Sequence, residues 1–197
     1  MMLSRVLGIR LDSDGVPRGR LADLVVDLNS GDEPQVSHLV AQFKGSGQQA
    51  VPWEVVSQLD LDGGKIVLST WQEDGDLAKP EHLPEDSVRL RYDVLDAAII
   101  DIPERRSYIA NDLWLEKQDG NLRLCSVDTS AWGIVRRMSH GLIDHRPKNG
   151  LRPWATVDYL RGVPHGPDES DQHHRLAQLP PGEIALLVEN LSYLHAT

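Results

Sequence analysis

The sequence predicts a mainly β protein made of two small β-barrel repeats, with one inserted helix and a short C-terminal helix. Three observations lead to this prediction. A segment of the chain recurs 89 positions later, short alternating stretches are separated by turn residues, and a proline–tryptophan pair follows the strands of each repeat. Many short strands with regularly spaced turn signals are typical of small barrels and sandwiches.

The internal repeat aligns Val6–Asp32 with Leu95–Asn121 at a constant offset of 89. In this register Asp23 matches Asp112, and each interrupts an apolar strand at the same place. A carboxylate that satisfies the backbone donors of a turn or bulge would be needed in both copies, whereas a catalytic acid would be needed once. The repetition therefore favours a structural role for both residues.

Alternating apolar residues predict the strands of the first repeat. Asp14-Gly15 and Asn29–Asp32 tolerate the left-handed backbone angles of hairpin turns. The expected strands are Leu7–Leu11, Arg18–Leu28, Val36–Phe43, Gln49–Val51 and Ile66–Thr70.

Two proline–tryptophan pairs, Pro52-Trp53 and Pro153-Trp154, end the strand pairing of the two repeats. Proline cannot donate to a strand ladder, and we expect the tryptophan after it to close the open end of each barrel. The offset between these pairs is 101, so the second copy needs an insertion. Helical spacing of apolar residues predicts a helix there, over 130–142.

These features predict the domain organisation. The two repeats are joined by an acidic, proline-containing linker, and a second linker precedes an apolar tail with helical periodicity. The expected parts are a first repeat over 1–72, a linker over 73–87, a second repeat over 88–161, a flexible linker over 162–175 and a helical tail over 176–197.

The first repeat resembles the PRC-barrel domain, named for the photosynthetic reaction-centre H subunit and also found in a ribosome-maturation factor. The resemblance is carried by the Leu7-Gly8 opening, the Asp14-Gly15 turn, the Gly19–Asp27 strand and the Val51–Val56 closure. It implies a small, side-chain-filled β-barrel.

The second repeat, from Arg91 to Leu115, is similar to the degenerate second half found in proteins that couple PRC-barrel repeats to the intracellular N-terminal region of MgtE-type magnesium transporters. It departs from the first copy by having Glu104–Arg106 at the turn, and Leu176–Leu191 resembles the opening helix of that transporter region. The resemblance implies a link to magnesium transport and Mg²⁺ as the associated ion.

Composition and charge limit the class of partner. A net charge of −10 argues against nucleic-acid binding, since phosphate contacts need clustered Lys and Arg. The stretch 136–152 is locally basic, either as a solvated helix end or as a docking patch for an acidic partner or lipid headgroups. No run is long enough to form a transmembrane segment, and we find no secretory signal. With a single cysteine, Cys125, this predicts a cytoplasmic protein.

The familiar catalytic motifs are absent from the sequence, so we expect no enzymatic activity. Gly45–Gly47 lies between two expected strands, which favours a hairpin turn over a phosphate loop. Cys125 lies in an apolar strand without a basic neighbour in sequence, as expected for an inert thiol.

Two sets of residues could bind metal. Imidazole and carboxylate groups that suit zinc cluster in the second linker, where the alternative is a solvated, flexible segment. Hard oxygen ligands for Mg²⁺ could come from acidic turns in the first repeat, where the alternative is ordinary turn chemistry. The zinc candidates are His165, Asp168, His173 and His174, with Glu169 and Asp171 nearby, and the magnesium candidates are Asp12, Asp14, Asp27 and Asp32.

The sequence therefore predicts a non-enzymatic, cytoplasmic protein-interaction or regulatory module, linked by resemblance to magnesium transport. Its protein partner is unidentified, and a sheet edge or the tail helix would bind it. A homodimer remains open. Two alternatives are an RNA-processing or ribosome-assembly accessory protein, which calls for a basic face, and a divalent metal sensor.

Overall fold

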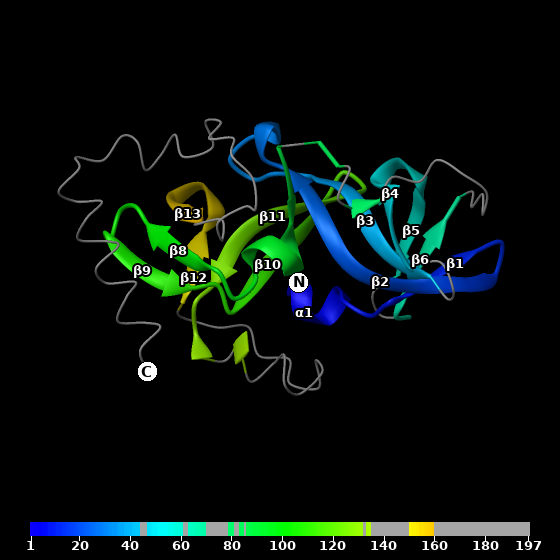
Figure 1. Cartoon of the computed structure of the whole chain (residues 1–197), viewed down its shortest axis with the longest axis horizontal. Coiled ribbons are helices and arrows are strands. Elements are labelled where there is room, and N and C mark those ends of the chain that lie inside the picture. Colours follow the sequence, from blue (N-terminus) through cyan, green and yellow to red (C-terminus); the bar gives the residue numbers. More distant parts are fainter. Residues whose placement is uncertain are drawn as a thin grey trace.

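The chain was analysed as a computed structural model that describes residues 1–43, 47–60, 63–69, 79–80, 83–84, 86–131, 133–134 and 150–159. Most of these residues lie in strands, which confirms the predicted mainly β class. We refer to residues 1–69 as the first half and to residues 86–159 as the second half. The two halves lie side by side, with the helix α1 between them (Figure 1).

The first half begins with a short helix and continues as a set of mostly antiparallel strands with two 3₁₀ turns. Its elements are α1 (Leu3–Val6), β1 (Arg10–Ser13), β2 (Val16–Asp27), the 3₁₀ helix η1 (Leu28–Ser30), β3 (Val36–Phe43), β4 (Gly47–Pro52), the 3₁₀ helix η2 (Trp53–Val55), β5 (Val56–Asp60) and β6 (Lys65–Leu68).

The second half follows a similar order, with a π-helix in place of α1. Its elements are β7 (Ser87–Arg89), the π-helix η4 (Leu90–Val94), β8 (Ala98–Asp101), β9 (Arg106–Ile109), β10 (Asp112–Gln118), β11 (Asn121–Asp128), β12 (Leu151–Pro153), the 3₁₀ helix η5 (Trp154–Thr156) and β13 (Val157–Tyr159).

The start of the first half differs from the expected strand over Leu7–Leu11. Leu3–Val6 forms a helix instead, and the strand begins only at Arg10. Between them the chain turns at Gly8, which has a φ of 80° and donates its N–H to the Leu21 carbonyl at 2.8 Å. A positive φ is incompatible with a strand, so the turn delays the strand by three residues.

The described strands form open sheets, so the expectation of two closed barrels is wrong for this part of the chain. The strand orders are β4-β3-β2-β1-β6-β5 in the first half, and β10-β11-β12 and β13-β8-β9 in the second. The sheet of the first half ends at β4 and β5, and its long strand β2 also connects it to the second half. The C-terminal part of β2 uses its second edge to pair with β7 of the second half, with Val26 opposite Val88.

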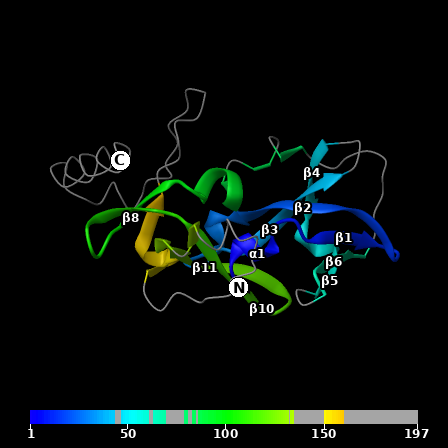
Figure 2. The same cartoon turned by 90° about the horizontal axis from the view of Figure 1, so that it is seen from below.

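The two halves exchange their first strand-like segments. While β7 pairs with β2, Met2 forms an antiparallel bridge with Trp114 of β10, and the Leu115 N–H donates to the Met1 carbonyl at 2.7 Å. The start of each half thus extends the sheet of the other. Figure 2 shows α1 lying beside β10, with β2 and β3 next to it.

The central hairpins of the two halves share their irregularities. The β2–β3 ladder shifts register between Val25 and Val26, and the β10–β11 ladder shifts between Trp114 and Leu115. These pairs of positions are 89 residues apart, the offset of the sequence repeat. A β-bulge at the same place in both ladders bends both hairpins in the same way.

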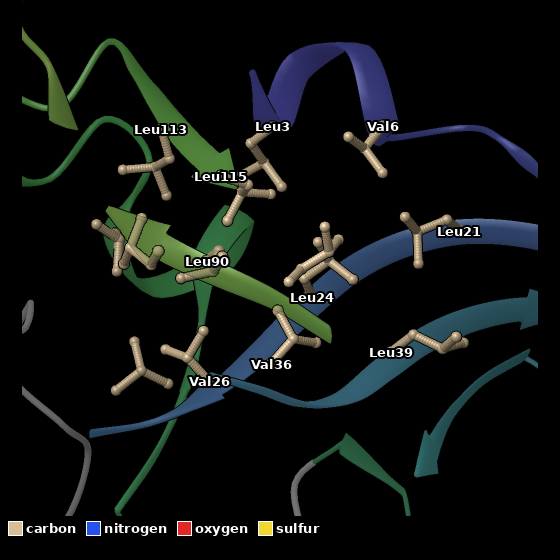
Figure 3. Close-up of a cluster of buried hydrophobic side chains, with 14 of the residues drawn as sticks. Leu3, Val6, Leu21, Leu24, Val26, Val36, Leu39, Leu90, Leu113 and Leu115 are labelled. Atoms are coloured by element: carbon tan, nitrogen blue, oxygen red, sulfur yellow. The ribbon is translucent and has the colours of Figure 1, made fainter. Parts of the chain in front are cut away.

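The larger of two hydrophobic clusters among the described residues spans both halves. Leu3 of α1, Leu24 of β2, Leu90 of η4 and Leu115 of β10 are fully buried in one cluster. Figure 3 shows these side chains pointing toward one another from four different elements. Neither half encloses this cluster alone, because each contributes one helix and one long strand.

Several predicted parts lie outside the described residues. Ala131, Gly133 and Ile134 are helical, at the start of the helix expected over 130–142, and the rest of that helix is not described. The linker over 162–175 and the tail over 176–197 also lie outside. At the first linker, Ser87 belongs to β7 rather than to a connecting segment.

Candidate functional site: the junction between the two halves

Asp23 links the first half to the turn that opens the second. It is buried in β2, where its Oδ1 accepts hydrogen bonds from the N–H groups of Leu24 and Arg91, both at 2.7 Å. Its Oδ2 accepts from the Tyr92 N–H at 3.0 Å. One carboxylate therefore satisfies three backbone donors that the chain would otherwise bury without partners.

Asp112 forms the matching link in the opposite direction. It is fully buried in β10, and its Oδ1 accepts from the N–H groups of Leu113 at 2.9 Å and Ser4 at 3.1 Å. Its Oδ2 accepts from the Ser4 hydroxyl at 2.6 Å. Each carboxylate therefore holds the short helical turn that begins the other half. We call these two groups of contacts the Asp23 clamp and the Asp112 clamp.

Burial affects the ionisation of the Asp23 clamp. Loss of hydration raises the pKa of Asp23 to about 6, although its three backbone hydrogen bonds and the nearby charge of Arg89 act in the opposite direction. The Asp23 clamp therefore exchanges a proton close to neutral pH.

The two tryptophans predicted to close barrels occupy corresponding places. Trp53 and Trp154 are both buried, and each begins a 3₁₀ helix directly after a proline that ends a strand. Pro52 lies opposite His38 in the β3–β4 ladder, and Pro153 lies opposite Ser126 in the β11–β12 ladder. Because the sheets are open, the tryptophans pack into the shared core rather than at the mouth of a closed barrel.

The Trp53 ring also contributes to the junction. Its indole Nε1–H donates to the Gly120 carbonyl, in the β10–β11 turn of the second half, at 3.3 Å. Trp154 instead lies near Tyr159 of its own half, with ring centroids 5.9 Å apart. Sequence reasoning assigned both residues one role within their repeats and missed this contact across the junction.

A network around Arg152 was also missed by sequence reasoning, which placed this residue in a basic stretch. Its guanidinium lies 3.3 Å from the buried Asp101 carboxylate, also contacts Glu104, and donates to the Tyr108 hydroxyl at 3.1 Å. Hydrogen bonds from Arg152 and Tyr108 lower the pKa of Glu104. The charge of Arg152 is thus balanced within the second half, and the other basic residues of 136–148 lie outside the described part.

The metal candidates do not meet in the described structure. The Asp12 carboxylate pairs with Arg10 at 2.7 Å, and the Asp27 Oδ1 accepts from the Asn29 N–H at 2.9 Å. Among the described residues no three His, Cys, Asp or Glu side chains are grouped so that they could hold an ion. The zinc candidates His165, Asp168, His173 and His174 lie outside those residues.

Cys125 of β11 has the environment of an unreactive thiol. Partial burial, together with the negative charges of Glu33 and Glu116, raises its pKa to about 11. The side chain therefore stays protonated at neutral pH. Because the thiolate is the nucleophilic form, this thiol is unreactive.

Comparison with known proteins does not assign the chain to a family. No protein-family model matches the chain, and no curated protein matches it. Within the described residues, no helix has the length and apolar character needed to cross a membrane.

Proposed function

We propose that the chain is a non-enzymatic protein-interaction module of the cytoplasm, built from two copies of a PRC-barrel-like unit. The observation that carries the proposal is the pair of clamps. Asp23 and Asp112, the buried acids that recur in the sequence, accept hydrogen bonds from backbone donors of the opposite half. Buried carboxylates whose oxygens accept backbone hydrogen bonds in this way hold a scaffold together.

Two other buried carboxylates, Asp128 and Asp101, support the same interpretation. Asp128 accepts from the Ser130 N–H at 2.9 Å, and Asp101 accepts from the Glu104 N–H at 3.0 Å while it faces Arg152. A junction held by two clamps and one shared core fixes the halves relative to each other. Such a rigid body presents its outer surface without a large cost of ordering upon binding.

The proposal extends to the partner class implied by the resemblance, a protein linked to magnesium transport. To test it, the purified full chain is immobilised and incubated with lysate, and captured proteins are quantified by mass spectrometry. The expected result is at least one partner retained in a near-stoichiometric amount after a high-salt wash. A chain that retains no protein above an unrelated acidic control would contradict the proposal.

A further inference from the structure

The π-helix η4 is the one helical turn at the junction that carries an extra residue. The first half closes its turn between the Leu7 N–H and the Leu3 carbonyl at 3.1 Å, and the second half closes its turn between the Leu95 N–H and the Leu90 carbonyl at 2.9 Å. The second loop therefore contains one more residue than the first. Single-residue insertions that create a π turn lower helix stability and are frequent at functional sites.

The extra residue allows Tyr92 to project from the junction. Tyr92 is 74% exposed, the highest fraction among the large hydrophobic side chains of the described residues, whereas its neighbours Leu90 and Val94 are fully buried. An exposed aromatic ring stays in contact with water, so it contributes no burial free energy to folding. Tyrosine is also one of the residue types that contribute most to binding at protein interfaces.

Tyr92 is held in place before any partner binds. The Arg89 guanidinium lies 3.7 Å from the centroid of its ring, and the Tyr92 N–H is fixed by Asp23 at 3.0 Å. Arg89 is positioned in turn by Asp93, which accepts the Arg89 N–H at 2.7 Å and lies 3.8 Å from its side-chain Nε. A ring fixed in this way loses little conformational entropy on binding.

The exposed guanidinium of Arg91 beside this ring is complementary to a carboxylate of a partner. Arg91 is exposed, and its Nη1 donates to the Ala22 carbonyl at 3.3 Å, which orients the guanidinium. The carboxylates that face the turn, Asp23 and Asp93, are both engaged by backbone N–H groups. Guanidinium groups bind carboxylates in a two-point geometry that lysine cannot match.

We infer that Arg89, Arg91 and Tyr92 form a docking surface for an acidic segment of a partner protein, which rests on the proposed function. A carboxylate of the segment binds Arg91, and an apolar side chain beside it packs on the face of the Tyr92 ring opposite Arg89. The docking surface lies in the second half, on a turn that the first half sets in place through Asp23.

The test uses the full chain and a fluorescent peptide of alternating Glu and Leu, with a matched peptide in which Gln replaces every Glu. Binding is followed by anisotropy at two salt concentrations. We expect the acidic peptide to bind and the Gln peptide to bind at least about tenfold more weakly, because the guanidinium groups lose their charged partner. Equal binding of the two peptides, or no binding of the acidic one, would overturn the inference.

Variants then locate the contact. Tyr92→Ala and Arg91→Gln should each weaken binding of the acidic peptide by about tenfold, as is typical of central interface residues. Lys117→Gln is the matched control, because it removes one positive charge from an exposed position at the far end of β10 and should leave binding unchanged. Thermal unfolding confirms that all three variants are folded.

The same variants separate this inference from the proposed function. If the lysate partner is retained by the wild-type chain and equally by Tyr92→Ala, the interaction function stands and the docking surface is refuted. If Tyr92→Ala and Arg91→Gln lose the partner while Lys117→Gln keeps it, both are supported. A wild-type chain that binds the peptide but retains no partner would contradict the proposed function alone.

Discussion

The first half builds its sheet on one continuous strand of twelve residues, whereas the second half divides the corresponding stretch between β9 and β10. The break falls at Asn111, which occupies the position of Ala22 in the repeat register. The Asn111 side chain donates to the carbonyls of Thr129 and Ser130, at 3.2 and 3.1 Å. The small apolar Ala22 lies within a continuous strand, whereas the Asn111 amide bonds to the backbone that follows β11, where the strand is interrupted.

The outer strands differ as well. In the first half β6 lies between β1 and β5, and it runs parallel to β1. In the second half β13 follows its 3₁₀ turn directly onto β8, in an antiparallel pair. The two carboxylate clamps agree between the halves, and the outer strands differ. The comparison teaches that the paired carboxylates constrain both halves alike, while the outer strands are free to diverge.

The largest effect should come from the leucines that each half places in the shared core. Leu3→Ala and Leu90→Ala should each lower the free energy of unfolding by about 2–5 kcal/mol, because each leaves a cavity at a fully buried position. Urea denaturation measures the loss. The two halves should unfold together in both variants, and separate transitions for the halves would show that the core is not shared.

The second effect is the pH dependence that Asp23 gives to the free energy of unfolding. Since the pKa of Asp23 is raised from 3.8 to about 6, the native state binds its proton more tightly than the unfolded chain does. The contribution of Asp23 to the free energy of unfolding should be greatest below pH 3.8 and should decline as the pH rises through 6. The full difference is about 3 kcal/mol, at 1.36 kcal/mol per pKa unit.

Denaturation curves between pH 4 and 7 for the wild type and Asp23→Asn provide the measurement. The neutral variant should lack this part of the pH dependence. Parallel curves for wild type and Asp23→Asn would contradict the raised pKa.

A smaller effect should come from Arg152, which has no counterpart in the first half, where Val51 occupies the position next to the proline. Arg152→Gln should lower the free energy of unfolding by about 1–2 kcal/mol, because the buried Asp101 loses its ion pair. Chemical denaturation measures this change. Lys117→Gln, an exposed charge with no ion pair to another described residue, should stay within about 0.5 kcal/mol of the wild type.

The smallest effect concerns the turn between helix and first strand. Gly8 has a φ of 80° in the first half, and Asp96 has a φ of 66° in the second. Gly8→Ala should cost about 1 kcal/mol from the left-handed backbone alone, because nothing lies within 4 Å of the added Cβ. Gly8→Asn should cost less, since asparagine tolerates this region. Equal melting temperatures for wild type and Gly8→Ala would contradict this account.

Sequence patterns located the features that depend on local residues. The strand Val36–Phe43 has the bounds expected from alternation, and the structural use of Asp23 and Asp112 was anticipated from their repetition alone. The turn at Asp14-Gly15 also follows from residue type, since both have positive φ. In each case the signal lies within a few residues of the feature.

The features that depend on distant contacts could not be predicted. The helix Leu3–Val6 is too short to show periodicity, and it is held by Asp112, 108 positions along the chain from Ser4. Ser87, the first residue of β7, was assigned to the linker because its pairing partner, Asp27, lies in the other half. The exposed position of Tyr92 likewise follows from one inserted residue, which becomes visible only when the two turns are compared.

The exchange of first segments has a consequence for synthesis. Met1 of the first half finds its hydrogen-bonding partner in Leu115 of the second, 114 positions later along the chain. Long-range pairing of this kind slows folding, because a large loop must close before the contact forms. Until the second half has been synthesised, the edge of β2 that pairs with β7 is unpaired and the shared core is incomplete. This interval is when a chaperone, or a neighbouring nascent chain, would have access to it.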